Sequence, residues 1–187
     1  MISHNIGQFF ALQYFRLFNR YKYKSKIISI FEHINSASRV CVCLPCDDED
    51  FHKSLISIEQ FRQIFPKAQI TLLNCTDQRI DPKKFHAFRL LTYDRQQLTF
   101  FGFPSSEIRH DIAISKFDVF IDLSLSFSFV NTALSWLSNA GLRICFNNPK
   151  RDNLNNFVVR LDPETKWDKS YQQLLQYLGV KKSSVNK

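Results

Sequence analysis

The chain has 187 residues, which is room for one ordinary domain with short appendages. Hydrophobic residues make up 44% of it and only four residues are glycine, so a wholly disordered chain and a low-complexity chain are both excluded. No uninterrupted apolar run approaches the ~18–20 residues that a membrane-spanning helix needs.

The net charge of +8 lies at the two ends of the chain. Residues 1–31 contain five cations and no acid, residues 181–187 contain three lysines and no acid, and residues 32–180 are neutral. A neutral body argues against a nucleic-acid groove, so we expect no nucleic-acid partner. The basic N-terminal residues instead favour contact with an anionic membrane surface or a protein partner. These contact residues are Arg16, Arg20, Lys22, Lys24 and Lys26.

Residues 5–31 are rich in aromatic side chains, and their apolar residues recur at spacings of three and four. This predicts one or two helical segments. Such a helix can lie in a membrane interface, or it can pack on the surface of its own domain with its cations turned to water. The second interpretation is the commoner one, since surface helices are amphipathic by default. We therefore divide the chain into a basic aromatic extension (1–34), one domain (35–180) and a flexible basic tail (181–187).

From residue 39 onward, short β-rich runs alternate with helical spacing. Strands are expected at 39–44, 70–74, 88–92, 117–123, 142–146 and 157–161, and helices at 51–65, 108–115, 127–139 and 167–178. Residues 98–103 fit either a further strand or an extended loop. This alternation predicts an α/β fold: a single Rossmann-like domain of three layers, with a mostly parallel sheet of five or six strands.

Ligands of such sheets bind outside the carboxyl ends of the strands, which makes the loops at 45–50, 75–81 and 123–128 the informative ones. The first of these loops contains four consecutive acids, Asp47 to Asp50. One of them can supply a general base, or all four can simply begin the next helix, where acids favour the helix dipole. We favour the second interpretation, because acids are common in the first turn of a helix. The candidate ligand-binding residues are Asp47, Asp48, His52, Ser124 and Ser126.

Five cysteines and no secretory signal ahead of them predict reduced thiols in a cytoplasmic protein. Cys41, Cys43 and Cys46 have no second Cys pair to complete a zinc site, and no glycine-rich phosphate loop occurs. We therefore expect neither a metal nor a cofactor. Arg143, within a predicted strand, is expected to pair with Asp118 or Asp122.

Four stretches, in order, resemble the glycosyltransferases of family 9, the heptosyltransferase type. Phe65-Pro66-Lys-Ala-Gln-Ile-Thr-Leu-Leu73 resembles the family's step into its second strand, and Phe117-Asp-Val-Phe-Ile-Asp-Leu123 a later buried strand. Leu137-Ser-Asn-Ala-Gly-Leu-Arg-Ile-Cys-Phe146 and Tyr171-Gln-Gln-Leu-Leu-Gln-Tyr-Leu-Gly-Val180 resemble the turn and the closing helix that follow. The resemblance spans about residues 39–180.

The family has two facing Rossmann-like domains, the GT-B arrangement, so the resemblance implies that this chain corresponds to the first, acceptor-side half. The second half, which carries most of the nucleotide-sugar site, has no counterpart here. The family's candidate base is an Asp after a Gly, and Asp50 falls near that position, although Glu49 replaces the Gly. Asp50 is accordingly the candidate catalytic residue.

Two functional hypotheses follow. In the first, favoured one, the chain is a non-catalytic domain that binds a partner or a glycan or lipid precursor of the cell envelope, in the cytoplasm or peripherally at the inner membrane. In the second, it is the acceptor-binding half of a heptosyltransferase-type enzyme that a separate donor-binding domain completes. A homo-oligomer is the remaining alternative for a partner.

Overall fold

The computed structural model describes residues 2–22, 29–161 and 167–179, and of residues 2–6, 18–22 and 167–168 it describes the backbone only. Six strands form one sheet, in which every neighbouring pair is parallel. The strands are β1 (Arg39–Cys43), β2 (Gln69–Cys75), β3 (Arg89–Tyr93), β4 (Val119–Asp122), β5 (Leu142–Phe146) and β6 (Phe157–Val159). Their order across the sheet is β3-β2-β1-β4-β5-β6. The predicted Rossmann-like α/β fold is therefore confirmed.

The central strands are buried on both faces, as parallel strands between helical layers must be. In β1, Val40 and Val42 point into the core on one face, while Cys41 and Cys43 point into the core on the other. The register aligns Val42 with Leu72 of β2 and with Ile121 of β4. These apolar rows form the packed core on both faces of the hydrogen-bonded sheet.

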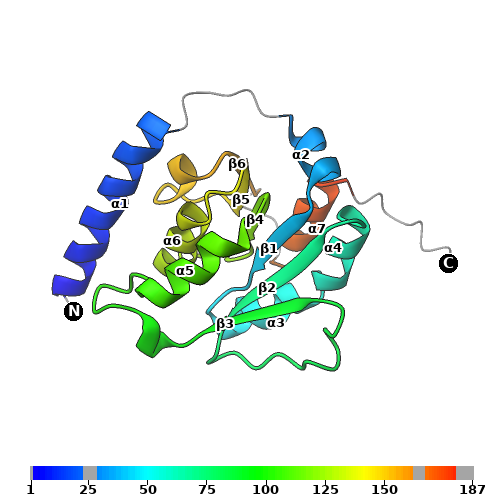
Figure 1. The fold of residues 1–187 in the computed structure, drawn as a ribbon, viewed down its shortest axis with the longest axis horizontal. Coiled ribbons are helices and arrows are strands. Elements are labelled where there is room, and N and C mark those ends of the chain that lie inside the picture. Colours follow the sequence, from blue (N-terminus) through cyan, green and yellow to red (C-terminus); the bar gives the residue numbers. More distant parts are fainter. Residues whose placement is uncertain (1, 23–28, 162–166, 180–187) are drawn as a thin grey trace.

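Helices cover both faces (Figure 1). The valine face packs against α3 (Asp48–Leu55), α4 (Ile58–Ile64), α7 (Trp167–Tyr177) and the end of α2 (Ile30–Ser36). The cysteine face packs against α5 (Ser106–Ser115) and α6 (Phe129–Leu137). Two short 3₁₀ turns, η1 (Arg95–Gln97) and η2 (Asp152–Leu154), lie in the segments that follow β3 and β5.

The single helix predicted over 51–65 is two helices, α3 and α4. Serine hydroxyls explain the break, because they compete for backbone carbonyls. Ser54 donates to the carbonyl of Phe51, and Ser57 donates to the carbonyl of Ser54 at 2.6 Å. Residues 98–103 take the loop alternative: outside the named strands, one bridge joins Leu98 to Pro104.

The basic N-terminal segment forms α1 (Ile2–Lys22), which packs on the outside of α6. Leu12 and Phe15 are buried there, and the Phe15 ring stacks on Trp136 with ring centres 4.4 Å apart. The interpretation of a helix packed on its own domain is thus confirmed for this face of α1. The proposed boundary at residue 34 falls inside α2, and the tail at 181–187 lies outside the described residues.

Candidate functional site

The carboxyl ends of β1 and β4 are neighbours, but the chain leaves them toward opposite faces of the sheet. After β1 it turns into α3 on one face, and after β4 it turns into α6 on the other. This divergence opens a crevice where α/β domains commonly bind ligands. A pocket of about 290 Å³ lies there. Its lining residues are Pro45, Cys46, Asp47, Ser124, Ser126, Phe127 and Ser128.

The acidic run begins α3, which confirms the capping interpretation of these acids. Asp47 is the N-cap, and its Oδ1 accepts the backbone N–H groups of Glu49 and Asp50 at 3.1 and 3.2 Å. Asp48, Glu49 and Asp50 fill the first turn, where their charges favour the helix dipole. Because both N–H donors use Oδ1, Oδ2 of the exposed Asp47 remains able to accept a ligand hydroxyl.

Asp50 joins the two loops that form the crevice. Asp50 is 6% exposed, and its carboxylate faces the backbone N–H groups of Ser126 and Leu125. Burial raises the pKa of Asp50, and these two N–H groups oppose that rise. The hydroxyl of Tyr171 donates nearby to the carbonyls of Asp50 and Leu123, at 3.2 and 3.1 Å. Asp50 therefore has a structural task, while its catalytic role stays a prediction.

The structure brings together three of the five predicted ligand-binding residues, Asp47, Ser124 and Ser126, which all line the crevice. Asp48 instead accepts a 2.7 Å hydrogen bond from the side chain of Gln78, in the loop after β2. His52 is exposed on α3, outside the crevice lining. Ligand binding by any of the five stays a prediction.

A buried polar network supports the β4 side of the crevice, and sequence reasoning missed most of it. Asp122 and Arg151, 1% and 0% exposed at their side chains, form an ion pair with 2.9 Å between Oδ2 and the guanidinium. Arg151 also donates to the carbonyls of Ser124 and Phe146. Asn131 donates to Oδ1 of Asp122 and to the hydroxyl of Ser124. These buried contacts thus fix the position of the loop after β4.

This network corrects the expectation about Arg143, because Arg151 supplies the partner of Asp122. Nε of Arg143 donates to the carbonyl of Leu154, and Asp118 accepts hydrogen bonds from Ser38 and from the backbone of Arg39. Of this ion pair, Asp122 alone was visible in the sequence, as an acid ending a buried strand. Arg151 stands in a polar loop 29 residues further on, without any motif around it.

A second pocket, of about 370 Å³, adjoins the crevice on the β2 and β3 side. Cys46 and Ser128 line both pockets, and Gln8 of α1 lines only this one. Cys75, Tyr93 and Arg95 form much of its remaining wall. Within the described part of the chain, no group of three or more His, Cys, Asp or Glu side chains is placed to hold a metal ion.

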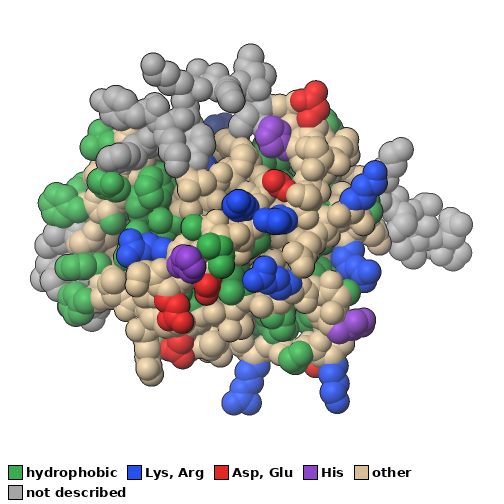
Figure 2. All heavy atoms as spheres, viewed as in Figure 1, with side chains coloured by type: hydrophobic (Ala, Val, Ile, Leu, Met, Phe, Trp, Pro, Cys, Tyr) green, Lys and Arg blue, Asp and Glu red, His purple; other side chains and the backbone are tan. Residues whose placement is uncertain are grey.

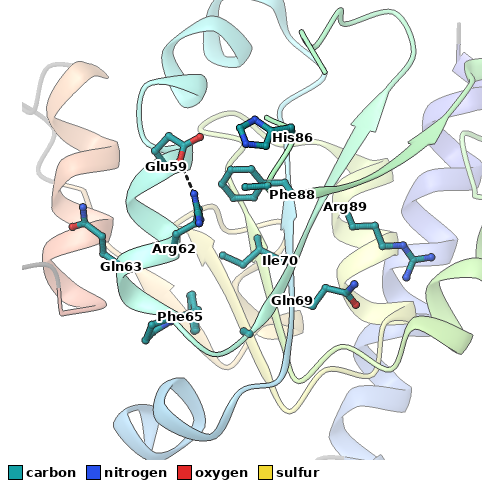
Figure 3. Close-up of a pocket in the computed structure, with 12 residues that line it drawn as sticks. Glu59, Arg62, Gln63, Phe65, Gln69, Ile70, His86, Phe88 and Arg89 are labelled. Carbon is teal, nitrogen blue, oxygen red and sulfur yellow. Dashed lines mark ion pairs between the residues drawn. The ribbon is translucent and has the colours of Figure 1, made fainter. Parts of the chain in front are cut away.

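A larger hollow, of about 810 Å³, lies between α4 and the amino ends of β2 and β3 (Figure 3). Arg62 on its wall pairs with Glu59 across 3.8 Å, and Arg89 and His86 also border it. It lies at the opposite end of the strands from the crevice. Because ligand sites of this fold occur at the carboxyl ends, size alone does not make this hollow the candidate site.

One predicted contact residue of the N-terminal segment is already engaged within the chain. The guanidinium of Arg16 donates to the carbonyls of Pro149 and Lys150, both at 3.2 Å. The side chains of Arg20 and Lys22, and all of Lys24 and Lys26, lie outside the described residues. Among the described helices, none is long and apolar enough to cross a membrane.

Apolar side chains nevertheless gather on the outer surface of α1 and on the neighbouring loop before α5. Figure 2 shows hydrophobic side chains on the side where α1 lies. We call this the aromatic patch; its members are Phe9, Phe10, Leu17, Phe100 and Phe101, each between 46% and 73% exposed. A ring contact joins Phe9 to Phe10, and another joins Phe100 to Phe101.

The fold and the crevice define a Rossmann-like α/β domain with its candidate site at the point where the strand order reverses. The chain belongs to a family of unknown function, DUF6913, which matches residues 16–180. No curated protein matches it.

Among solved structures, a glycosyl transferase family 9 protein from Veillonella parvula DSM 2008 has a similar fold, with a TM-score of 0.60 and 18% sequence identity. The match covers 83% of this chain and 45% of that one. The chain thus spans less than half the length of this structural relative, and the likeness supports the family 9 resemblance at the level of the fold.

Proposed function

We propose that this chain is a glycosyltransferase-like domain that binds a sugar-bearing precursor of the cell envelope and does not transfer sugar by itself. The observation that carries the proposal is the different environment of two acids, Asp47 and Asp50. Asp50 is buried and faces two backbone N–H groups, whereas Asp47 is exposed and lines the crevice. The site can therefore accept hydroxyl groups without presenting a buried base to them.

The other lining groups suit a saccharide. Ser126 offers an exposed hydroxyl, and the ring of Phe127 offers an apolar surface for one face of a sugar ring. The ammonium of Lys150 lies 5.1 Å from the centre of that ring, which adds a cation at the rim. A phosphorylated sugar would use all three features, and this is the ligand class that we infer.

A titration followed by amide NMR tests this proposal on the full chain. The probes are glucosamine, glucosamine 6-phosphate and UDP-glucose. We expect glucosamine 6-phosphate to shift the amides of Asp47, Ser126 and Ser128, and glucosamine to shift them more weakly. Ser126→Leu should weaken binding about tenfold, while Ser106→Leu, at an exposed serine on α5, should not. Shifts from none of the sugars, or only at residues far from the crevice, would contradict the proposal.

The second candidate is the acceptor-binding half of a glycosyltransferase, completed by a separate donor-binding domain. Its supporting observation is Asp50, whose raised pKa makes its carboxylate a better proton acceptor. In a reconstituted pair, Asp50→Asn should abolish transfer and leave the circular dichroism spectrum unchanged. Full turnover by the variant would remove this candidate. Tight binding of UDP-glucose by the lone chain would remove both candidates as stated.

We also propose that the aromatic patch and the N-terminal cations contact an anionic membrane from the cytoplasmic side. Aromatic side chains beside cations are typical of interfacial binding, in which the rings enter the headgroup region. Arg16 already donates hydrogen bonds to backbone carbonyls of its own domain. The proposed membrane contact therefore depends on the aromatic patch and on Arg20, Lys22, Lys24 and Lys26.

Co-sedimentation with vesicles of mixed neutral and anionic lipid tests the membrane proposal. Phe9→Ser with Phe10→Ser should reduce the bound fraction. Ile56→Ser is the matched control, because Ile56 is 80% exposed but lies on the α3–α4 turn, away from the patch. Equal binding by the double variant and the original chain would refute this contact. A patch that instead joins two copies would appear as a dimer by light scattering that the double variant loses.

A further inference from the structure

Two of the five cysteines meet at the carboxyl edge of the sheet. Cys75 is the last residue of β2, and Cys46 stands in the loop that follows the adjacent parallel strand β1. Both side chains belong to the same packed cluster on the cysteine face of the sheet. The hydroxyl of Tyr93 lies 3.0 Å from the sulfur of Cys46, and the carbonyl oxygen Oδ1 of Asn131 accepts from that thiol at 3.7 Å.

The two thiols have different surroundings. The neighbours of Cys75 that favour its thiolate are the Cys46 thiol, the backbone of Asp77 and the side chain of Arg95. These contacts, led by the Cys46 thiol, lower the pKa of Cys75 to about 6 against the opposing effect of burial. The same contact with Cys75, together with burial, raises the pKa of Cys46.

The charges around the pair come from several elements. The Arg95 guanidinium favours the Cys75 thiolate and is ion-paired with Asp77, whose carboxylate acts against that thiolate. Asp122, from the end of β4, disfavours a charge on Cys46. These surroundings favour the thiolate form at Cys75 and the thiol form at Cys46.

The pair borders a pocket, from which a small molecule would approach Cys75, whose own exposed fraction is 2%. Both cysteines line the 370 Å³ pocket described above, and Arg95 and Thr99 line it too. The other three cysteines are packed into the sheet: Cys41 and Cys43 are fully buried and Cys145 is 1% exposed. None of those three lines this pocket.

We propose that Cys46 and Cys75 are a dithiol that a hydroperoxide oxidises to an intramolecular disulfide. The Cys75 thiolate attacks the outer oxygen of the hydroperoxide, the O–O bond breaks, and an alkoxide leaves and takes a proton to become an alcohol. Cys75 is then a sulfenic acid. The Cys46 sulfur, losing its proton, displaces the hydroxyl group, which leaves as water, and the S–S bond forms. Two thiols lose two electrons, and the peroxide gains them.

The pairing of β1 with β2 brings the two backbones to about the separation that this bond needs. Neighbouring strands lie about 4.8 Å apart, and a disulfide needs Cα atoms about 4.4–6.8 Å apart. Cys46 follows β1, and Cys75 ends its paired neighbour. In a reducing compartment the pair stays reduced at rest, and oxidation is transient.

The test is oxidation of the purified full chain with hydrogen peroxide. We expect the denatured protein to lose two of its five free thiols and two hydrogens in mass, with one peptide crosslink joining Cys46 to Cys75. Cys46→Ser should stop at a sulfenic acid on Cys75 that dimedone traps, and Cys75→Ser should react far more slowly. Cys145→Ser is the matched control and should form the same crosslink as the original chain.

Alkylation by iodoacetamide tests the thiolate separately from oxidation. Its rate at Cys75 should be half-maximal near pH 6. At pH 7 the thiolate fraction is then roughly thirty times that of an ordinary thiol of pKa about 8.5. Arg95→Gln, at a side chain 66% exposed, should slow the reaction at pH 7 several-fold without unfolding the chain.

Three outcomes would overturn the proposal: a crosslink between two chains rather than within one, peroxide that adds oxygen to several cysteines without any crosslink, or a Cys75 that alkylates with an ordinary pH profile. The sugar titration is independent of all three, so failure of either proposal leaves the other standing.

Discussion

Replacing Arg151 with Met should remove a large part of the stability of the domain. Arg151 and Asp122 are almost wholly buried, so the change leaves a carboxylate in the interior without its cation. Breaking a buried pair in this way costs roughly 3–5 kcal/mol, against a total of about 5–15 kcal/mol for a domain. The lost donations to the carbonyls of Ser124 and Phe146 act in the same direction.

Urea unfolding followed by tryptophan fluorescence measures this effect. With a slope of about 2 kcal/mol per molar, a loss of about 4 kcal/mol lowers the midpoint by about 2 M. Arg62→Met is the control, because it breaks an exposed pair with Glu59 and should cost about 1 kcal/mol or less. Asp122→Asn combined with Arg151→Met should cost less than the sum of the two single changes. Additive losses, or a loss below about 1 kcal/mol for Arg151→Met, would refute the reasoning.

Three further predictions use the same unfolding assay. Tyr171→Phe removes a hydroxyl that bonds the carbonyls of Asp50 and Leu123, so it should cost about 1–3 kcal/mol; no measurable change would contradict those bonds. Phe15→Ala should cost roughly 3–5 kcal/mol because the ring is 2% exposed, whereas Phe10→Ala, 66% exposed, should stay within about 0.5 kcal/mol. The pKa of Asp50 is raised in the fold, so its contribution to stability is complete below the unfolded value of 3.8 and is lost as pH rises through the folded value. Asp50→Asn should therefore be more stable, relative to the original chain, at pH 7 than at pH 3.5; an equal difference at both values would exclude this effect.

The strands were predictable because their apolar runs are long enough to be buried on both faces. The run at 142–146 appears in the structure with the same bounds, and the run at 119–122 lies inside the predicted 117–123. The break between α3 and α4 was not predictable from spacing, since the apolar residues at Ile56 and Ile58 continue the pattern. It depends on hydroxyl-to-carbonyl bonds of Ser54 and Ser57, which compete locally with the helix.

The candidate site was only partly predictable, for a related reason. The rule that ligands meet the carboxyl ends of parallel strands located the crevice loops and so found Asp47 and Ser126. This rule does not predict side-chain orientation, and the carboxylate of Asp48 accepts a hydrogen bond from Gln78. Arg151 was missed because no local motif marks it. It pairs with Asp122 only because the fold buries the two side chains side by side.

The loop between β1 and α3 is the element on which both proposed activities depend. It is held on one side by Asp50, which reaches the β4–α6 loop, and on the other by Gln78, which donates to the carbonyl of Cys46 and to Asp48. Cys46 lines both the crevice and the thiol pocket, and Asp47 is the next residue. A bond from Cys46 to Cys75 would draw this loop toward β2. Because Asp47 begins α3 as its cap, the crevice wall cannot follow without moving the start of that helix. A disulfide at Cys46 would therefore form one residue from Asp47, so the sugar titration repeated on the oxidised chain measures whether the two proposed activities are linked.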